Sequence, residues 1–219
     1  MQASVKIMGT DVDMLSNDVF IKKINEYLTT EQLQVIFFAS AELLKQIEED
    51  ENNRRLLDIT ELFLPGMEEL LKDYQVEELK AGDMVVSCKS FGLVLENLKK
   101  EDRTVYIVAE SEEDAGMLKD YCLHMQPELK IIGASIYATD TDGAAVVNEI
   151  NSKIPDFLLL DLPIGKQEDF IVEHIAHLNA KLCIAIGGVA ELVMASKQKK
   201  QGLLEKLHLD SFFHKIFTK

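Results

Sequence analysis

The chain has 219 residues, of which 47% are hydrophobic, and its formal net charge is −15 at neutral pH. This length and composition predict a folded globular protein of one domain, or at most two small ones. The strong negative charge argues against nucleic acid and anionic lipid as partners, because both are bound through Lys and Arg side chains. The sequence has no apolar run near the roughly 18 residues that span a bilayer and no signal peptide, so we expect a cytoplasmic protein.

The N-terminal part of the sequence predicts strands that alternate with helices. Ser16 or Asn17 caps the first helix and Ser40 begins the second, because Ser and Asn are favoured at helix N-caps. A Pro65-Gly66 pair closes the third apolar segment. We therefore predict strands at residues 4–9, 33–38 and 59–64, a loop at 11–16, and helices at about 18–28, 40–49 and 67–74.

The C-terminal part continues this alternation. Residues 157–160 and 182–186 are short apolar runs without polar alternation, as expected of strands buried on both faces of a parallel sheet. The segment 167–178 between them has apolar residues at helical spacing. We also predict strands at 104–108 and 129–132, a weak strand or turn at 84–86, and helices at about 91–99, 111–125 and 140–150.

Strands that alternate with helices of about ten to fifteen residues are typical of βαβ units. The sequence therefore predicts a Rossmann-like α/β fold over residues 1–219, with a mainly parallel sheet and helices on both faces. Residues 197–219 are expected to form a reduced helical tail. The apolar part of this tail packs either on its own domain or on a neighbouring copy, so a homo-oligomer is left open.

The loop at residues 163–168, PIGKQE, is the best candidate for a ligand site. It joins a buried strand to a helix N-terminus, and ligands of open α/β sheets bind outside the carboxyl ends of the strands. Free backbone N–H groups and the helix dipole favour an anion there. Lys166 adds a cation, and Gln167 can both donate and accept hydrogen bonds. Alternatively, Glu168 only completes the helix start and Lys166 points to water.

Other chemistries have little support. His174 and His177 form the one close histidine pair and have no evident third ligand, so we expect no metal site. The cysteines at positions 88, 122 and 183 are far apart and are expected to be buried thiols. The sequence has no G-x-S-x-G motif, no P-loop, and no G-x-G-x-x-G after a strand.

The block NEINSKIPDFLLLDLPIGKQEDFI, followed by an apolar strand and Gly187-Gly188, resembles the TagA/WecG/CpsF glycosyltransferases. The likeness covers about residues 4–195, and the K-Q-E motif is its most specific part. These enzymes transfer N-acetylmannosamine or a related sugar from a UDP-sugar to an undecaprenyl-diphosphate-linked sugar in wall-polymer or antigen synthesis. The resemblance implies a UDP-sugar as substrate, no separate cofactor, and an acceptor at the membrane surface.

The sequence departs from the family pattern at its site. The family's Pro-Asp-Gly turn, whose Asp the resemblance implies as general base, is Leu-Pro-Gly here, and Glu68 is the nearest carboxylate. In the Thr-x-Asn-x-Glu motif only Glu42 is kept, and Ser40 replaces the Asn. Ala109 and Glu110 replace two glycines, and Glu191 replaces an Asp.

Two functions therefore stay open. In the first, the protein is a hexosaminyltransferase whose base is Glu68 or Glu42. In the second, it is a catalytically inactive relative that binds a nucleotide-sugar or acts as a scaffold for wall-synthesis enzymes. The residues expected to bind or line the nucleotide pocket are Lys166, Gln167, Gly187, Gly188, Glu191 and Ser40.

Overall fold

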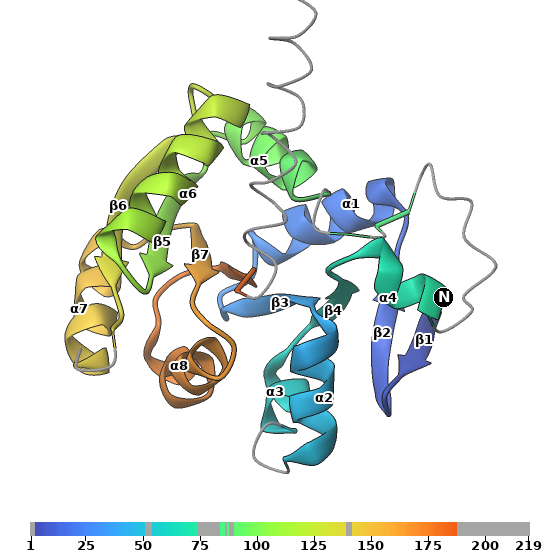
Figure 1. Cartoon of the computed structure of the whole chain (residues 1–219). Coiled ribbons are helices and arrows are strands. Elements are labelled where there is room, and N and C mark those ends of the chain that lie inside the picture. Colours follow the sequence, from blue (N-terminus) through green and yellow to red (C-terminus); the bar gives the residue numbers. More distant parts are fainter. Residues whose placement is uncertain are drawn as a thin grey trace, which may run out of the picture.

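The computed structural model describes residues 3–50, 54–73, 84–85, 87, 90–138 and 142–187 (Figure 1). Its centre is a six-stranded sheet in which all neighbouring strands are parallel, in the order β4-β3-β8-β7-β5-β6. The predicted Rossmann-like α/β fold is thus confirmed. The strands are β3 (Gln34–Ala39), β4 (Leu62–Pro65), β5 (Thr104–Ala109), β6 (Lys130–Ile136), β7 (Phe157–Asp161) and β8 (Leu182–Ala185).

Helices cover both faces of this sheet, as predicted. Successive strand residues point to opposite faces, so Phe38 packs in one hydrophobic core and Phe37 in the other. Above the sheet in Figure 1 lie α1 (Asn17–Tyr27), α5 (Phe91–Lys100) and α6 (Glu112–Met125). The other core is formed with α2 (Ala41–Glu49), α3 (Arg55–Ile59), α4 (Glu68–Asp73), α7 (Gly143–Lys153) and α8 (Lys166–His174), which continues into a 3-10 turn, η2 (Ile175–His177).

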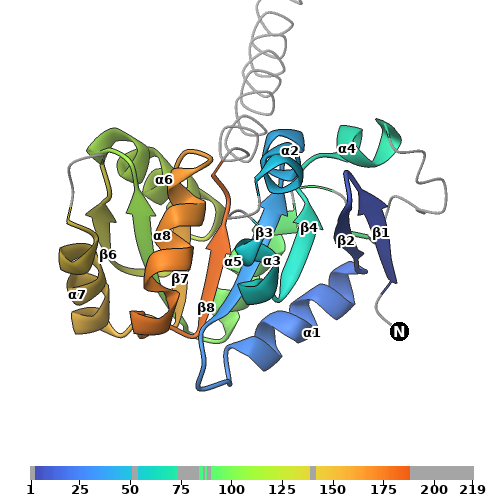
Figure 2. The same ribbon diagram turned by 90° about the horizontal axis from the view of Figure 1, so that it is seen from below.

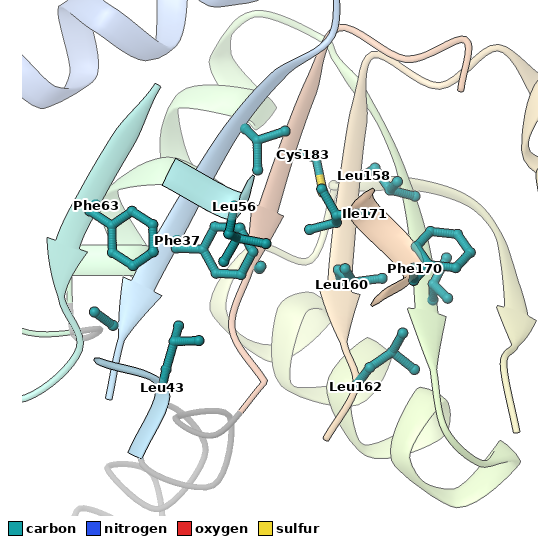
Figure 3. Packing of buried hydrophobic residues seen from close by; sticks show 14 of the residues in the cluster. Phe37, Leu43, Leu56, Phe63, Leu158, Leu160, Leu162, Phe170, Ile171 and Cys183 are labelled. Atoms are coloured by element: carbon teal, nitrogen blue, oxygen red, sulfur yellow. The ribbon is translucent and has the colours of Figure 1, made fainter. Parts of the chain in front are cut away.

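The second core explains why the strand sequences are continuously apolar. Phe37 of β3 stacks on Phe63 of β4 with ring centroids 5.4 Å apart, and Phe170 and Ile171 of α8 cover β7 (Figure 3). All four residues from 157 to 160 are fully buried. Burial on both faces removes the need for a polar residue at every second position.

The predicted loop at residues 11–16 is wrong, because most of it is a strand. β1 (Ala3–Ile7) and β2 (Thr10–Met14) form an antiparallel hairpin around a two-residue turn. Met8 and Gly9 both have positive φ, 47° and 76°, as tight hairpin turns require. Figure 2 shows the hairpin beside the β4 edge of the sheet. The aspartates at 11 and 13 alternate with buried residues, as in a strand with one face on the core, and a polar loop has no such alternation.

Smaller differences concern the ends of elements. The strand predicted to end before Gly133 continues to Ile136, because Gly133 leaves room for the ring of Tyr106 on β5. Helix α3 was not predicted, and α7 has Asp142 as its N-cap. The predictions for Gly188, Glu191 and the tail 197–219 lie outside the described residues. Among the helices of the described ranges, none has the length and hydropathy needed to cross a membrane.

Candidate functional site

The topology brings most of the predicted site residues to one edge of the sheet. Because all six strands are parallel, their carboxyl ends meet at the same edge. Ser40 and Glu42 follow β3, and Glu68 follows β4. Lys166 and Gln167 begin α8 after β7, and Gly187 follows β8. Gly188 and Glu191 lie outside the part of the chain that the structure describes.

Gln167 and Gly187 are hydrogen-bonded to each other at this edge. The Gln167 side-chain Nε2 donates to the carbonyl oxygen of Gly187 at 3.2 Å, and its Oε1 accepts from the Gly187 N–H at 3.1 Å. Gln167 is fully buried despite its polarity. Its amide thus joins the start of α8 to the residue pair that follows β8.

Glycine is required at position 187 because the backbone that follows β7 approaches it closely. A Cβ atom placed there would lie 1.7 Å from the carbonyl oxygen of Leu162 and 2.6 Å from Oε1 of Gln167. Any side chain would therefore overlap the backbone after β7 and displace the Gln167 amide. The close contact explains the glycine without a bound ligand.

Lys166 lies at the topological switch point of the sheet. Strands β5 and β7 are neighbours, yet the helix that follows β5, α6, covers one face and the helix that follows β7, α8, covers the other. Ligand crevices of open α/β sheets form where adjacent connections diverge in this way. Lys166 Nζ forms an ion pair there with the carboxylate of Glu110, which directly follows β5.

The buried carboxylate of Glu168 caps the N-terminus of its own helix, α8. Its carboxylate accepts a hydrogen bond from the Gly165 backbone N–H and a second from Gln167 Nε2 at 3.0 Å. Burial raises the pKa of Glu168, although the hydrogen bonds from the backbone and from Gln167 oppose this. The alternative that Glu168 completes the helix start thus describes its structural role, whereas Lys166 is paired with Glu110 and its side chain is 28% exposed.

Ser40, predicted to line the nucleotide pocket, and the two carboxylates considered as bases lie towards the β4 end of this edge. Ser40 is buried and caps α2, with its Oγ accepting from the Leu43 N–H at 3.1 Å. Glu42 is exposed in the first turn of α2. Glu68, in the first turn of α4, forms an ion pair with Lys72 at 3.7 Å, and its side chain is 40% exposed. Three strand spacings separate β4 from β7, a distance of about 14 Å.

Tyr137 is a site residue that the sequence did not indicate. It follows β6, and its ring packs edge-on against Phe170 with centroids 4.9 Å apart. Burial and the carboxylates of Glu173 and Asp169 raise the pKa of Tyr137, while Lys166 lowers it. Tyr137 therefore adds a hydroxyl near the switch point, and a polar aromatic directly after a predicted strand is the signal that could have identified it.

Asp156, in the motif that carries the family likeness, lies at the opposite edge. Its Oδ2 accepts hydrogen bonds from the backbone N–H and the hydroxyl of Thr104, each at 3.0 Å. Arg103 Nη1 contacts its other oxygen at 3.3 Å. Burial acts to raise the pKa of Asp156, but the bonds to Thr104 and the charge of Arg103 outweigh it and lower the pKa. Asp156 ties the start of β7 to that of β5 and is structural.

Within the part of the chain that the structure describes, the other reactive side chains are not assembled into a centre of their own. In the described ranges, no group of three His, Cys, Asp or Glu residues is placed to hold a metal ion. His174 and His177 line a shallow groove of about 360 Å³ beside α7. Cys122 and Cys183 are buried, and burial raises the pKa of each thiol to about 12. Cys88 lies outside the described residues.

The comparison with protein families covers almost the whole chain. The model of the glycosyl transferase WecG/TagA/CpsF family matches residues 5–214, nearly the whole chain. No curated protein matches the sequence significantly. The chain therefore belongs to the WecG/TagA/CpsF family of glycosyl transferases, as its K-Q-E block suggested.

Proposed function

We propose that this member of the WecG/TagA/CpsF family transfers a hexosamine resembling N-acetylmannosamine from a UDP-sugar to a lipid-diphosphate-linked acceptor. The protein would act in cell-wall or surface polysaccharide synthesis. It would work in the cytoplasm and meet its acceptor at the membrane surface as a peripheral protein. No separate cofactor is needed in this scheme, because the UDP-sugar is itself the activated substrate.

The observation that carries the proposal is that a cation for the diphosphate and carboxylates that could act as a base lie along the same edge of the sheet. Lys166 lies at the switch point, where it can meet the diphosphate that leaves with negative charge. Glu68 and Glu42 lie in the first turns of helices that follow β4 and β3, which are three and two strand spacings from β7, about 14 and 10 Å, and an acceptor hydroxyl can lose its proton there. Between them lies the Gln167–Gly187 pairing, over which the sugar-nucleotide would extend.

A second function is favoured by the internal pairing of the polar groups. The Gln167 amide is used by Gly187, the Ser40 hydroxyl by the helix cap, and Lys166 by Glu110. These groups stabilise the edge without a ligand. A protein that holds a nucleotide-sugar weakly, or that serves as a scaffold for other wall-synthesis enzymes, would need no catalytic base.

Release of UDP distinguishes the two functions. The full chain is incubated with a set of UDP-hexosamines, with and without an undecaprenyl-diphosphate-linked acceptor, and free UDP is measured. Acceptor-dependent release supports the transferase. Binding of a UDP-sugar by calorimetry without release supports the binding protein, and absence of both with folded protein rejects the nucleotide-sugar proposal.

A further inference from the structure

The ion pair between Lys166 and Glu110 joins two loops that the topology sends to opposite faces. Glu110 immediately follows β5, and Lys166 is the first residue of α8. Their side chains are 39% and 28% exposed, so water and small ligands can reach the pair. Because each residue lies at the end of a core element, the ion pair lies at the position where the sheet connections diverge.

The surroundings of this pair are acidic. The first turn of α6 carries Glu112, Glu113 and Asp114, and the first turn of α8 carries Glu168 and Asp169. Lys166 is the basic residue within these two first turns. An anionic ligand that enters at the switch point must therefore compete with the Glu110 carboxylate for Lys166, and it meets further negative charge nearby.

This competition depends on how much charge the ligand carries. A terminal phosphate carries about −1.5 to −2 near neutral pH, whereas a phosphate esterified on both sides carries about −1. Free UDP and pyrophosphate thus bring more negative charge to Glu110 than a UDP-sugar does. Repulsion by Glu110 should weaken the binding of the free diphosphates more than that of the sugar ester.

We propose that Glu110 is a specificity-determining residue, which yields Lys166 to a sugar-capped diphosphate and disfavours free UDP and pyrophosphate. The inference rests on the proposed function, because it concerns the same ligand edge. For a transferase, such a preference would speed departure of UDP after transfer. For a binding protein, it would separate the loaded nucleotide from its spent form.

Calorimetry on the full chain tests this inference with UDP, pyrophosphate and UDP-N-acetylmannosamine as probes. In Glu110→Gln, binding of UDP and pyrophosphate should tighten at least tenfold, and binding of the UDP-sugar by clearly less. Asp120→Asn removes the same charge from an exposed position later in α6, outside this acidic first turn, and should change each affinity less than twofold. Adding Lys166→Met to Glu110→Gln should remove the gain. Glu110→Ser repeats the test if the Gln variant misfolds.

The outcomes separate the inference from the proposed function. Unchanged affinities in Glu110→Gln, or an equal gain for all three probes, overturn the role of Glu110, while binding of the UDP-sugar by the wild type still upholds the proposed function. If the wild type does not bind the UDP-sugar but Glu110→Gln binds pyrophosphate through Lys166, the proposed function fails, and the preference for the sugar ester is overturned with it. If neither the wild type nor Glu110→Gln binds any of the three probes, the inference and the proposed function are both overturned.

Discussion

The side-chain amide of Gln167 is hydrogen-bonded to both backbone polar groups of Gly187, and the pair is buried between the ends of β7 and β8. A glutamine in the middle of a family motif is easily assigned to ligand recognition. Here the same side chain also joins two strand ends, so its replacement should lower the stability of the protein whether or not it affects binding.

Replacing Gln167 by Ala should lower the free energy of unfolding by about 1–3 kcal/mol, because the N–H and carbonyl of Gly187 lose their buried partner. Urea denaturation measures the change. Gln167→Glu should cost at least as much, since a carboxylate cannot donate to the Gly187 carbonyl and lies next to that of Glu168. The exposed Gln32 is the control, and an equal effect of Gln32→Ala would contradict the pairing.

Replacing Gly187 by Ala should destabilise the protein by about 3 kcal/mol or more, because the new Cβ overlaps the Leu162 carbonyl oxygen. Gly116 is the matched control. It lies inside α6 with open space where a Cβ would be. Gly116→Ala should therefore stabilise by about 0.5–1 kcal/mol. The melting temperature should fall in Gly187→Ala and rise in Gly116→Ala, and a change in the same direction in both variants would refute the close contact.

Asp156→Asn should lower the stability of the protein at neutral pH and make that stability less dependent on pH in the acid range. Since the fold lowers the pKa of Asp156, its contribution is present above the ordinary Asp value of about 3.9 and is lost as the pH falls through the folded pKa. The variant lacks this contribution and should be about 1–2 kcal/mol less stable at neutral pH. The gap should narrow in acid. Asp58→Asn, at an exposed position, should show neither effect.

Glu168→Gln should change the pH dependence of stability in the opposite sense. The fold raises the pKa of Glu168, so its contribution is complete below the ordinary Glu value of about 4.3 and is lost as the pH rises through the folded pKa. Relative to the variant, the wild type should lose stability as the pH rises above about 4. Denaturation curves at several pH values measure this, and a constant difference between the two proteins would reject it.

Glu68→Gln and Glu42→Gln identify the base if transfer is observed. Loss of a general base should lower kcat by about 10²–10⁴-fold and leave the affinity for the UDP-sugar unchanged. Glu69→Gln, at the next and exposed position of α4, is the control. If transfer survives in both variants at the level of the control, neither carboxylate is the base.

The sequence predicted the parallel sheet because its signals are local. The apolar runs at 157–160 and 182–186 are buried on both faces, and the caps at Ser16, Ser40 and Ser111 accept from backbone N–H groups at the helix starts. The β2 strand was missed because Asp13 looks like a loop residue. Its Oδ2 instead accepts from the Phe63 N–H of edge strand β4 at 2.9 Å, a contact between residues 50 positions apart.

For the candidate site, the sequence predicted the edge of the sheet but not the contacts among its residues. The Lys166–Glu110 pair joins residues 56 positions apart, and the Gln167–Gly187 pair depends on β7 and β8 lying side by side. Periodicity reports burial within one element, whereas these contacts are set by strand order. The sequence could therefore indicate which edge carries the polar residues, but not that they are paired with one another.

Strand order also sets when the candidate edge can form during synthesis. In the six-stranded sheet, β3 and β4 are joined to the other strands through β8, the last of the six to be translated. A nascent chain that has not yet released residue 185 from the ribosome holds Glu42 and Glu68 in one unfinished half and Lys166 in another. Such late, distant pairing slows folding and leaves the edges of β3 and β7 open to neighbouring chains. The six-stranded sheet can therefore be completed only after the four residues of β8 have been synthesised.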